Sequence, residues 1–116
     1  MREISEIIYA ILSTDPALIA AVGNKVFPLI ADQNVKEPFV TFNISEEAAY
    51  SKESKLQYTV TVSSYDKEYN DAIDLAELVK TALLVNATEV FNYEGGQPYL
   101  NDENQLSVVQ SYKIMN

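Results

Sequence analysis

The sequence contains no cysteine, no histidine and no tryptophan, and only 3 of its 116 residues are glycine. Without cysteine the chain has no disulfide, no thiolate metal ligand and no cysteine nucleophile. Without histidine it has no Ser-His-Asp triad, no imidazole base and no imidazole metal ligand. These absences leave Asp, Glu, Lys, Tyr and Ser as the side chains from which an active site would have to be built.

Basic side chains and long apolar runs are also scarce. The chain has 8 Lys and Arg against 17 Asp and Glu, a formal net charge of −9. Because nucleic-acid phosphates are met by Lys and Arg, we expect no specific nucleic-acid binding. The longest apolar run, residues 17–22, is far shorter than the ~20 residues that span a bilayer. With Glu3 and Glu6 so near the N-terminus, we expect neither a signal peptide nor a membrane association, and an intracellular protein.

What is present is typical of one folded domain spanning residues 1–116, since 47% of the side chains are hydrophobic. Residues 3–22 predict a pair of helices, because isoleucine and leucine recur at helical spacing. Asp15 is the expected N-cap of the second helix and Pro16 its first residue. Gly23 is expected to end that helix in the left-handed conformation.

The rest of the chain predicts strands and one long helix. The helix is expected over 66–85, with Asp66 as N-cap, because apolar residues recur there with a 3.6-residue period. Glycine, proline and polar residues predict turns at 95–98 and 101–104. The expected strands are 26–30, 39–44, 56–65, 89–93 and 106–114. The order favours an α+β fold: a mostly antiparallel sheet of about four strands, with the long helix and the helix pair packed on it.

A search for catalytic or metal-binding groups yields little. Neighbouring carboxylates occur at Glu46-Glu47, at Asp71 with Asp74, and at Asp102-Glu103. They fall in expected loops or on the polar side of a helix, where a solvated acidic surface is the ordinary interpretation. The ligand pattern of a calcium loop and the Lys-Ser/Thr of a phosphate loop are both missing. We therefore expect no enzyme, no cofactor and no metal.

The connection between two expected strands, residues 45–55, is the best candidate for a contact surface. It is longer than an ordinary hairpin loop and mixes both signs of charge. Tyr50 stands in it without a strand pattern, and tyrosine is favoured at protein interfaces. A mixed-sign loop can pair with a second copy of itself, although a solvated loop is the simpler alternative. The candidate interface residues are Glu46, Glu47, Tyr50, Lys52, Glu53 and Lys55.

A family resemblance appears when the segments are taken in order. After the first helix come DPAL at 15–18, VGNKVFP at 22–28 and EPFVTF at 37–42. A strand ending VTVSSY and a long helix from about Tyr69 follow. Over roughly residues 4–85 the chain resembles the tail-completion, or head–tail joining, proteins of long-tailed bacteriophages and prophages. The residues that carry this resemblance are structural: Gly23, Phe27, Pro28, Pro38 and Phe39.

The resemblance implies a non-enzymatic structural protein that forms a ring on the upper end of the tail tube and joins it to the head connector. By family analogy the ring is a hexamer, made in the host cytoplasm and then carried in the virion tail. The implied partners are a second copy, the tail tube protein and the head connector protein. Two alternatives stay open: an acidic adaptor or binding module of another assembly, and an enzyme built from the few remaining side-chain types.

Overall fold

The computed structural model describes residues 2–31, 34–48 and 56–115. The chain begins with two helices, continues with three strands, then a long helix that ends in a π-helical turn, and closes with two strands. Their bounds are α1 (Arg2–Thr14), α2 (Pro16–Val22), β1 (Val26–Pro28), β2 (Phe39–Ala48), β3 (Leu56–Tyr65), α3 (Tyr69–Thr81), η1 (Ala82–Asn86), β4 (Asn92–Leu100) and β5 (Leu106–Met115).

The strands form one sheet in the order β1-β2-β3-β5-β4. β1 runs parallel to β2, and the other neighbours are antiparallel, so the sheet is mostly antiparallel as the sequence predicts. It has five strands where about four were expected, since the short β1 also joins it. The fold is α+β, with the helices segregated to one face.

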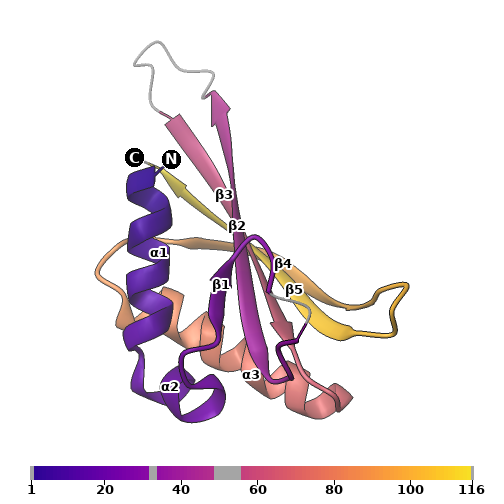
Figure 1. The fold of residues 1–116 in the computed structure, drawn as a ribbon. Helices are drawn as coiled ribbons and strands as arrows, with labels where there is room; N and C mark the ends of the chain where they lie inside the picture. Colours follow the sequence, from indigo (N-terminus) through magenta and orange to yellow (C-terminus); the bar gives the residue numbers. More distant parts are fainter. Residues whose placement is uncertain (1, 32–33, 49–55, 116) are drawn as a thin grey trace.

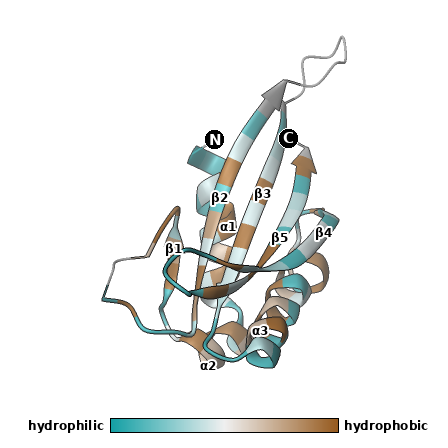
Figure 2. Cartoon of the chain, turned by 90° about the vertical axis from the view of Figure 1, so that its right-hand side faces the viewer, coloured by the Kyte–Doolittle hydropathy of each residue, from teal (hydrophilic) through white to brown (hydrophobic). Residues whose placement is uncertain are grey.

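Figures 1 and 2 show α1 and α3 on the same side of the sheet, with α2 at the lower end. Between helices and sheet lies a continuous core to which every helix contributes, for example Leu12, Leu18 and Val79, each with no exposed surface. Among the described residues no single helix is long and apolar enough to cross a membrane; α1 and α2 together reach that length and composition but are bent by 76°.

The break between α1 and α2 is organised by Asp15, which is almost fully buried. Its carboxylate accepts a hydrogen bond from the Ala17 amide at 3.1 Å, the capping role expected from the sequence. The other carboxylate oxygen accepts from the Asn86 side chain at 3.4 Å, which ties the helix pair to the end of η1. Gly23 ends α2 with the positive φ expected of it, 65°, but its ψ of −126° lies outside the left-handed helical conformation that the sequence predicts.

The long helix is shorter than the expected 66–85. Asp66 is not its N-cap: the Asp66 carboxylate accepts from the next amide, Lys67, at 2.7 Å, and the cap position belongs to Glu68. The α-helix ends at Thr81 and the chain continues as the wider turn η1. Asn86 is the last residue of that turn.

The C-terminal hairpin differs most from expectation. The strand expected at 89–93 is β4, Asn92–Leu100, so the turn expected at residues 95–98 is wrong. Gly95 and Gly96 are instead accommodated within the strand, at a register shift between Tyr93 and Gly95. The turn expected at residues 101–104 is present, where the Asn101 side-chain oxygen accepts from the Glu103 and Gln105 amides. Figure 1 shows this hairpin projecting away from the helices.

Candidate functional site

The predicted contact loop is shorter than expected because its two flanking strands continue. β2 and β3 pair from Phe39↔Tyr65 to Ala48↔Leu56. Glu46 and Glu47 therefore lie in β2, opposite Tyr58 and Gln57, and the loop expected from Ser45 onward is wrong over these residues. The other candidates, Tyr50, Lys52, Glu53 and Lys55, lie outside the described residues. Their part in an interface stays a prediction.

The structural motif residues gather around the lower end of β2. Pro28 is the last residue of β1, and Pro38 directly precedes the first residue of β2, Phe39. The Phe27 ring meets the Phe39 ring edge-on, with 6.4 Å between centroids. Phe39 in turn stacks on Tyr65 of β3 at 4.5 Å. The motif thus builds a small aromatic cluster, Phe27-Phe39-Tyr65, on the sheet face opposite the helices.

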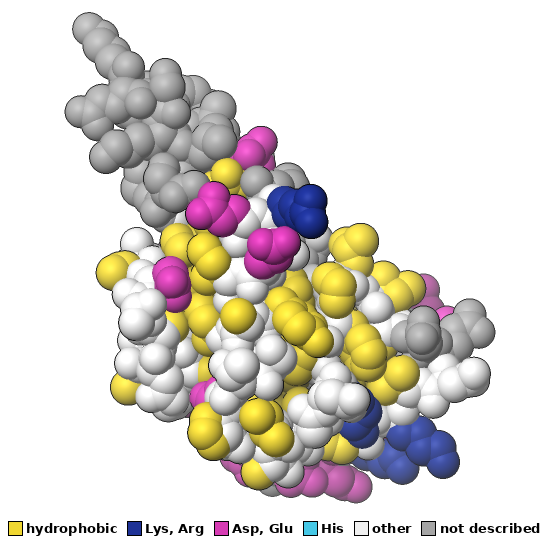
Figure 3. Space-filling model, turned by 60° about the vertical axis from the view of Figure 1, so that its left-hand side comes forward, with side chains coloured by type: hydrophobic (Ala, Val, Ile, Leu, Met, Phe, Trp, Pro, Cys, Tyr) yellow, Lys and Arg dark blue, Asp and Glu magenta, His cyan; other side chains and the backbone are white. Residues whose placement is uncertain are grey.

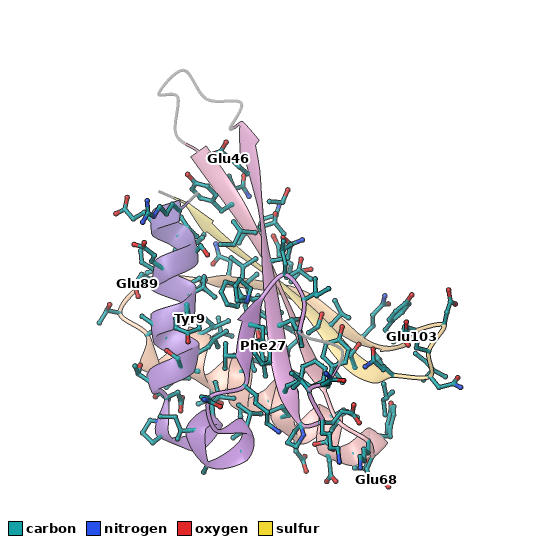
Figure 4. All side chains as sticks on the ribbon, in the orientation of Figure 1. Tyr9, Phe27, Glu46, Glu68, Glu89 and Glu103 are labelled. Atoms are coloured by element: carbon teal, nitrogen blue, oxygen red, sulfur yellow. The ribbon has the colours of Figure 1, made fainter. Side chains whose placement is uncertain are left out.

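A hollow of about 510 Å³ adjoins the aromatic cluster. Phe39, Thr41 and Tyr65 form its floor, and Leu29 and Ile30 line it beyond the end of β1. Glu103, at the tip of the β4–β5 hairpin, lines it from the other side (Figure 4). Aromatic and aliphatic side chains line this hollow together with polar groups, among them Thr41, Gln105 and the Glu103 carboxylate.

The carboxylates do not converge on a common site. Figure 4 shows Glu46, Glu68, Glu89 and Glu103 at separate corners of the molecule. Within residues 2–31, 34–48 and 56–115 no group of three or more acidic side chains is placed to hold a metal ion. General acid–base catalysis by two carboxyls requires them to face each other across a pocket, which these four do not.

One buried tyrosine has a strongly perturbed acidity. Burial raises the pKa of the Tyr112 hydroxyl well above its usual range, and the neighbouring Tyr93 and Glu77 raise it further. The hydroxyl donates to the Gln110 side-chain oxygen at 3.0 Å, inside the core. Because Tyr112 has no exposed surface, its perturbed pKa stems from its packing and gives no access to a substrate.

A second surface lies where β1 ends. Val40 donates to the Lys25 carbonyl at 3.0 Å, and the Phe42 carbonyl accepts from Leu29 at 2.7 Å. At Leu29, whose φ is 66°, the chain leaves β2. From residue 43 to residue 48, no strand of the described part of the chain neighbours β2 on that side, and we call this stretch the open edge of β2. One feature of the sequence indicates this open edge: Pro28, because a proline confines a strand to a sheet edge or marks the end of the strand.

An apolar groove of about 340 Å³ runs beside the start of the open edge. Phe42 and Ile44 of β2 line it together with Pro28, Leu29 and two residues of α1, Arg2 and Ser5. Figure 3 shows further apolar side chains on the surface on the side of α1, with both acidic and basic side chains toward the upper and lower ends of this face. Exposed large apolar residues include Tyr9, Ile19, Ile30, Leu84, Val85, Val90, Tyr99 and Leu100. Single exposed apolar side chains are common on folded proteins, so the groove beside the open edge is the candidate contact surface of this region.

Comparisons with known proteins give a fold relative. No model of a known protein family matches the chain, and no curated protein sequence matches it. Among solved structures, one chain from the "Virion of native gene transfer agent (GTA) particle" superposes with a TM-score of 0.76. The match covers 93% of this chain and 90% of that chain, at 14% sequence identity. The chain thus shares the fold of a component of a virion particle over nearly its whole length.

Proposed function

We propose that this chain is a non-enzymatic structural protein of a phage or prophage tail. In this role it forms a ring on the upper end of the tail tube, hexameric by family analogy, and joins the tube to the head connector. It assembles in the host cytoplasm and remains in the virion tail. The observation that carries the proposal is the shared fold with a virion component over 93% of the chain. The motif residues at 15–42 point independently to the same class of protein.

The surface chemistry supports an assembly role over a catalytic one. Subunits of a ring contact each other through two different faces and contact the tube and the head connector through others, so each copy needs several separate contact surfaces. The groove beside the open edge of β2 and the hollow beside the Phe27-Phe39-Tyr65 cluster are two candidates for such surfaces, on opposite faces of the sheet. A net charge of −9 keeps free subunits soluble and apart before they meet their partners.

The test uses tail tubes assembled in the absence of this chain. Electron microscopy of such tubes mixed with the purified protein is expected to show a ring at one end of each tube. Tubes capped in this way are expected to join filled heads, whereas uncapped tubes do not. Tube ends that stay bare at saturating protein would overturn the proposal. Binding to another partner without ring formation would favour the alternative, an acidic adaptor of a different assembly.

The predicted contact loop gives a matched variant for the same assay. Tyr50→Ala is expected to leave the melting temperature unchanged and to lower the fraction of capped tubes, since tyrosine contributes strongly to protein interfaces. Lys67→Ala, on an exposed residue between β3 and α3, serves as the control. Equal capping by the wild-type protein and by Tyr50→Ala would remove Tyr50 from the interface.

A further inference from the structure

The sheet has two edges that are incompletely covered. At one edge β1 pairs only with Val40, Thr41 and Phe42, so residues 43–48 of β2 form the open edge defined above. At the other edge β4 has β5 as its neighbour on one side, and no strand within residues 2–31, 34–48 and 56–115 on the other. Uncovered edges present free backbone N–H and C=O groups, which readily pair with a further strand.

Alternation along the strands shows which backbone groups are free on β2. The Val40 amide and the Phe42 carbonyl point toward β1, as their hydrogen bonds show. Because direction alternates along a strand, the peptide groups of Ile44 and Glu46 point the same way, into the open edge. Those of Asn43 and Ser45 point toward β3. In the described part of the chain no proline and no lysine blunts this edge.

The same alternation, carried across β3 and β5, defines the outer side of β4. Gly95, Gln97 and Tyr99 point toward β5, and the peptide groups of Gly96 and Pro98 point outward. Proline has no N–H, so Pro98 blocks the C-terminal half of the outer edge. The N-terminal half, residues 92–96, stays able to pair.

The two usable half-edges overlap in level where residues 43–45 of β2 face residues 92–95 of β4 across the sheet. Following the pairs across the strands, Tyr93 of β4 is level with Ile44 of β2. The blocked position, Pro98, is level with Val40, which β1 already covers. Three successive antiparallel pairings separate β2 from β4, so the two strands run in opposite directions. A second copy placed beside the first would therefore bring usable edge to usable edge in antiparallel orientation.

We propose that neighbouring copies of this chain join by pairing residues 43–45 of the open edge of β2 with residues 92–95 of β4 of the next copy. The contact is heterologous, as a ring requires, and the inference rests on the proposed ring-forming function. The register shift between Tyr93 and Gly95 bends β4, which is what a sheet continuing from copy to copy around a ring needs.

Side chains on β4 are already positioned for this contact. The Tyr93 ring packs on the Tyr112 ring, with 5.3 Å between centroids, and the Lys80 ammonium lies 4.4 Å from the Tyr93 centroid. Glu94 lies 3.9 Å from the Lys113 ammonium, so its charge is partly balanced before it approaches the acidic end of β2. Because these side chains are already held in place in the single copy, less side-chain entropy is lost when the strands of two copies pair.

Because the chain has no cysteine, a cross-link provides a direct test. Ser45 of β2 and Asn92 of β4 are exposed and level with each other across the sheet. In one copy they are three strand spacings apart, about 14 Å, which no disulfide spans. Between paired copies they come within disulfide reach. The double variant Ser45→Cys/Asn92→Cys, oxidised on tail tubes, is expected to give a ladder of covalent oligomers, and each single variant none.

A backbone test complements the cross-link. Ile44 is level with Tyr93, and its peptide group points into the open edge. Ile44→Pro removes this outward N–H without breaking a β2–β3 hydrogen bond, whereas Ile44→Ala truncates the same side chain and keeps the N–H. Ring formation on tail tubes is expected to be at least about tenfold lower for Ile44→Pro than for Ile44→Ala, the tenfold loss corresponding to one lost interface hydrogen bond at each contact. Rings that form without the disulfide ladder, with both Ile44 variants assembling equally, would overturn the strand pairing and leave the proposed function intact. Bare tube ends for the wild-type protein would overturn both.

Discussion

The two faces of the sheet use the same strands in different ways. On the face toward the helices, β2 and β3 present apolar side chains that are almost fully buried, such as Val40, Phe42, Val60 and Val62. On the opposite face the same strands present mainly small polar side chains, such as Asn43, Thr61 and Ser63. One pattern of alternation therefore produces a core on one side and a mostly polar surface on the other.

The exception on the opposite face is the Phe27-Phe39-Tyr65 cluster. Phe39 and Phe42 lie three residues apart on β2, point to opposite faces, and are equally buried, at 4% and 3% exposed surface. Phe42 belongs to the main core, with the Tyr9 ring 6.5 Å away, while Phe39 borders the 510 Å³ hollow. The two rings are therefore equally buried but have different surroundings. Phe42 is packed within the core, whereas Phe39 adjoins the hollow at the surface.

The largest effect is expected for Phe42→Ala. Truncation removes a ring from the continuous core and leaves a cavity that neighbouring strands and α1 fill only partly, so the free energy of unfolding should fall by about 4 kcal/mol. Urea unfolding followed by circular dichroism measures it. A loss below about 2 kcal/mol would mean that the core relaxes around the site, and that the main core is less rigid than its burial indicates.

A smaller effect is expected for Phe39→Ala. The Phe39 ring has fewer packing contacts on the side of the hollow, so the free energy of unfolding should fall by only about 2 kcal/mol. This loss comes mainly from the stacking on Tyr65 and from the buried apolar area. Phe39→Leu keeps most of the apolar area and is the matched control, with an expected loss under about 1.5 kcal/mol. If Phe39→Ala destabilises as much as Phe42→Ala, the two faces are equally important for folding and the distinction between them fails.

Much of this arrangement could be predicted from local sequence. Strict alternation in 39–44 and 56–65 indicated which side chains face the helices, and Asp15, Pro16 and Gly23 defined the helix pair. These features depend on neighbours within a few residues. The turn predicted at 95–98 was wrong for the same reason, because glycine and proline prefer turns locally whereas pairing with β5 holds these residues in a strand. Pro98 is tolerated in β4 because its missing N–H would point toward the outer edge.

The candidate site was less predictable because it depends on strand pairing. Nothing local to Ser45 indicates that β2 continues to Ala48; the continued ladder with β3 decides it. The open edge of β2 exists only because β1 is short and the chain leaves it at Leu29. The hollow brings together residues from the segment after β1, from β2 and β3, and from the turn of the β4–β5 hairpin. Such long-range contacts carry no signal in a single sequence.

The smallest effect concerns the polar pair within the helix-covered face, Tyr112 and Gln110. Because the pKa of Tyr112 in the folded protein lies above its ordinary value of 10.0, the folded state keeps a proton that the unfolded chain loses above about pH 10. The stabilisation is complete below that pH and is lost as the pH rises further. The free energy of unfolding, measured from about pH 8 to about pH 11, should therefore decrease more steeply for the wild-type protein than for Tyr112→Phe, which has no proton to lose there. Parallel curves would show that the hydroxyl ionises equally in both states, and that this part of the covered face is open to water.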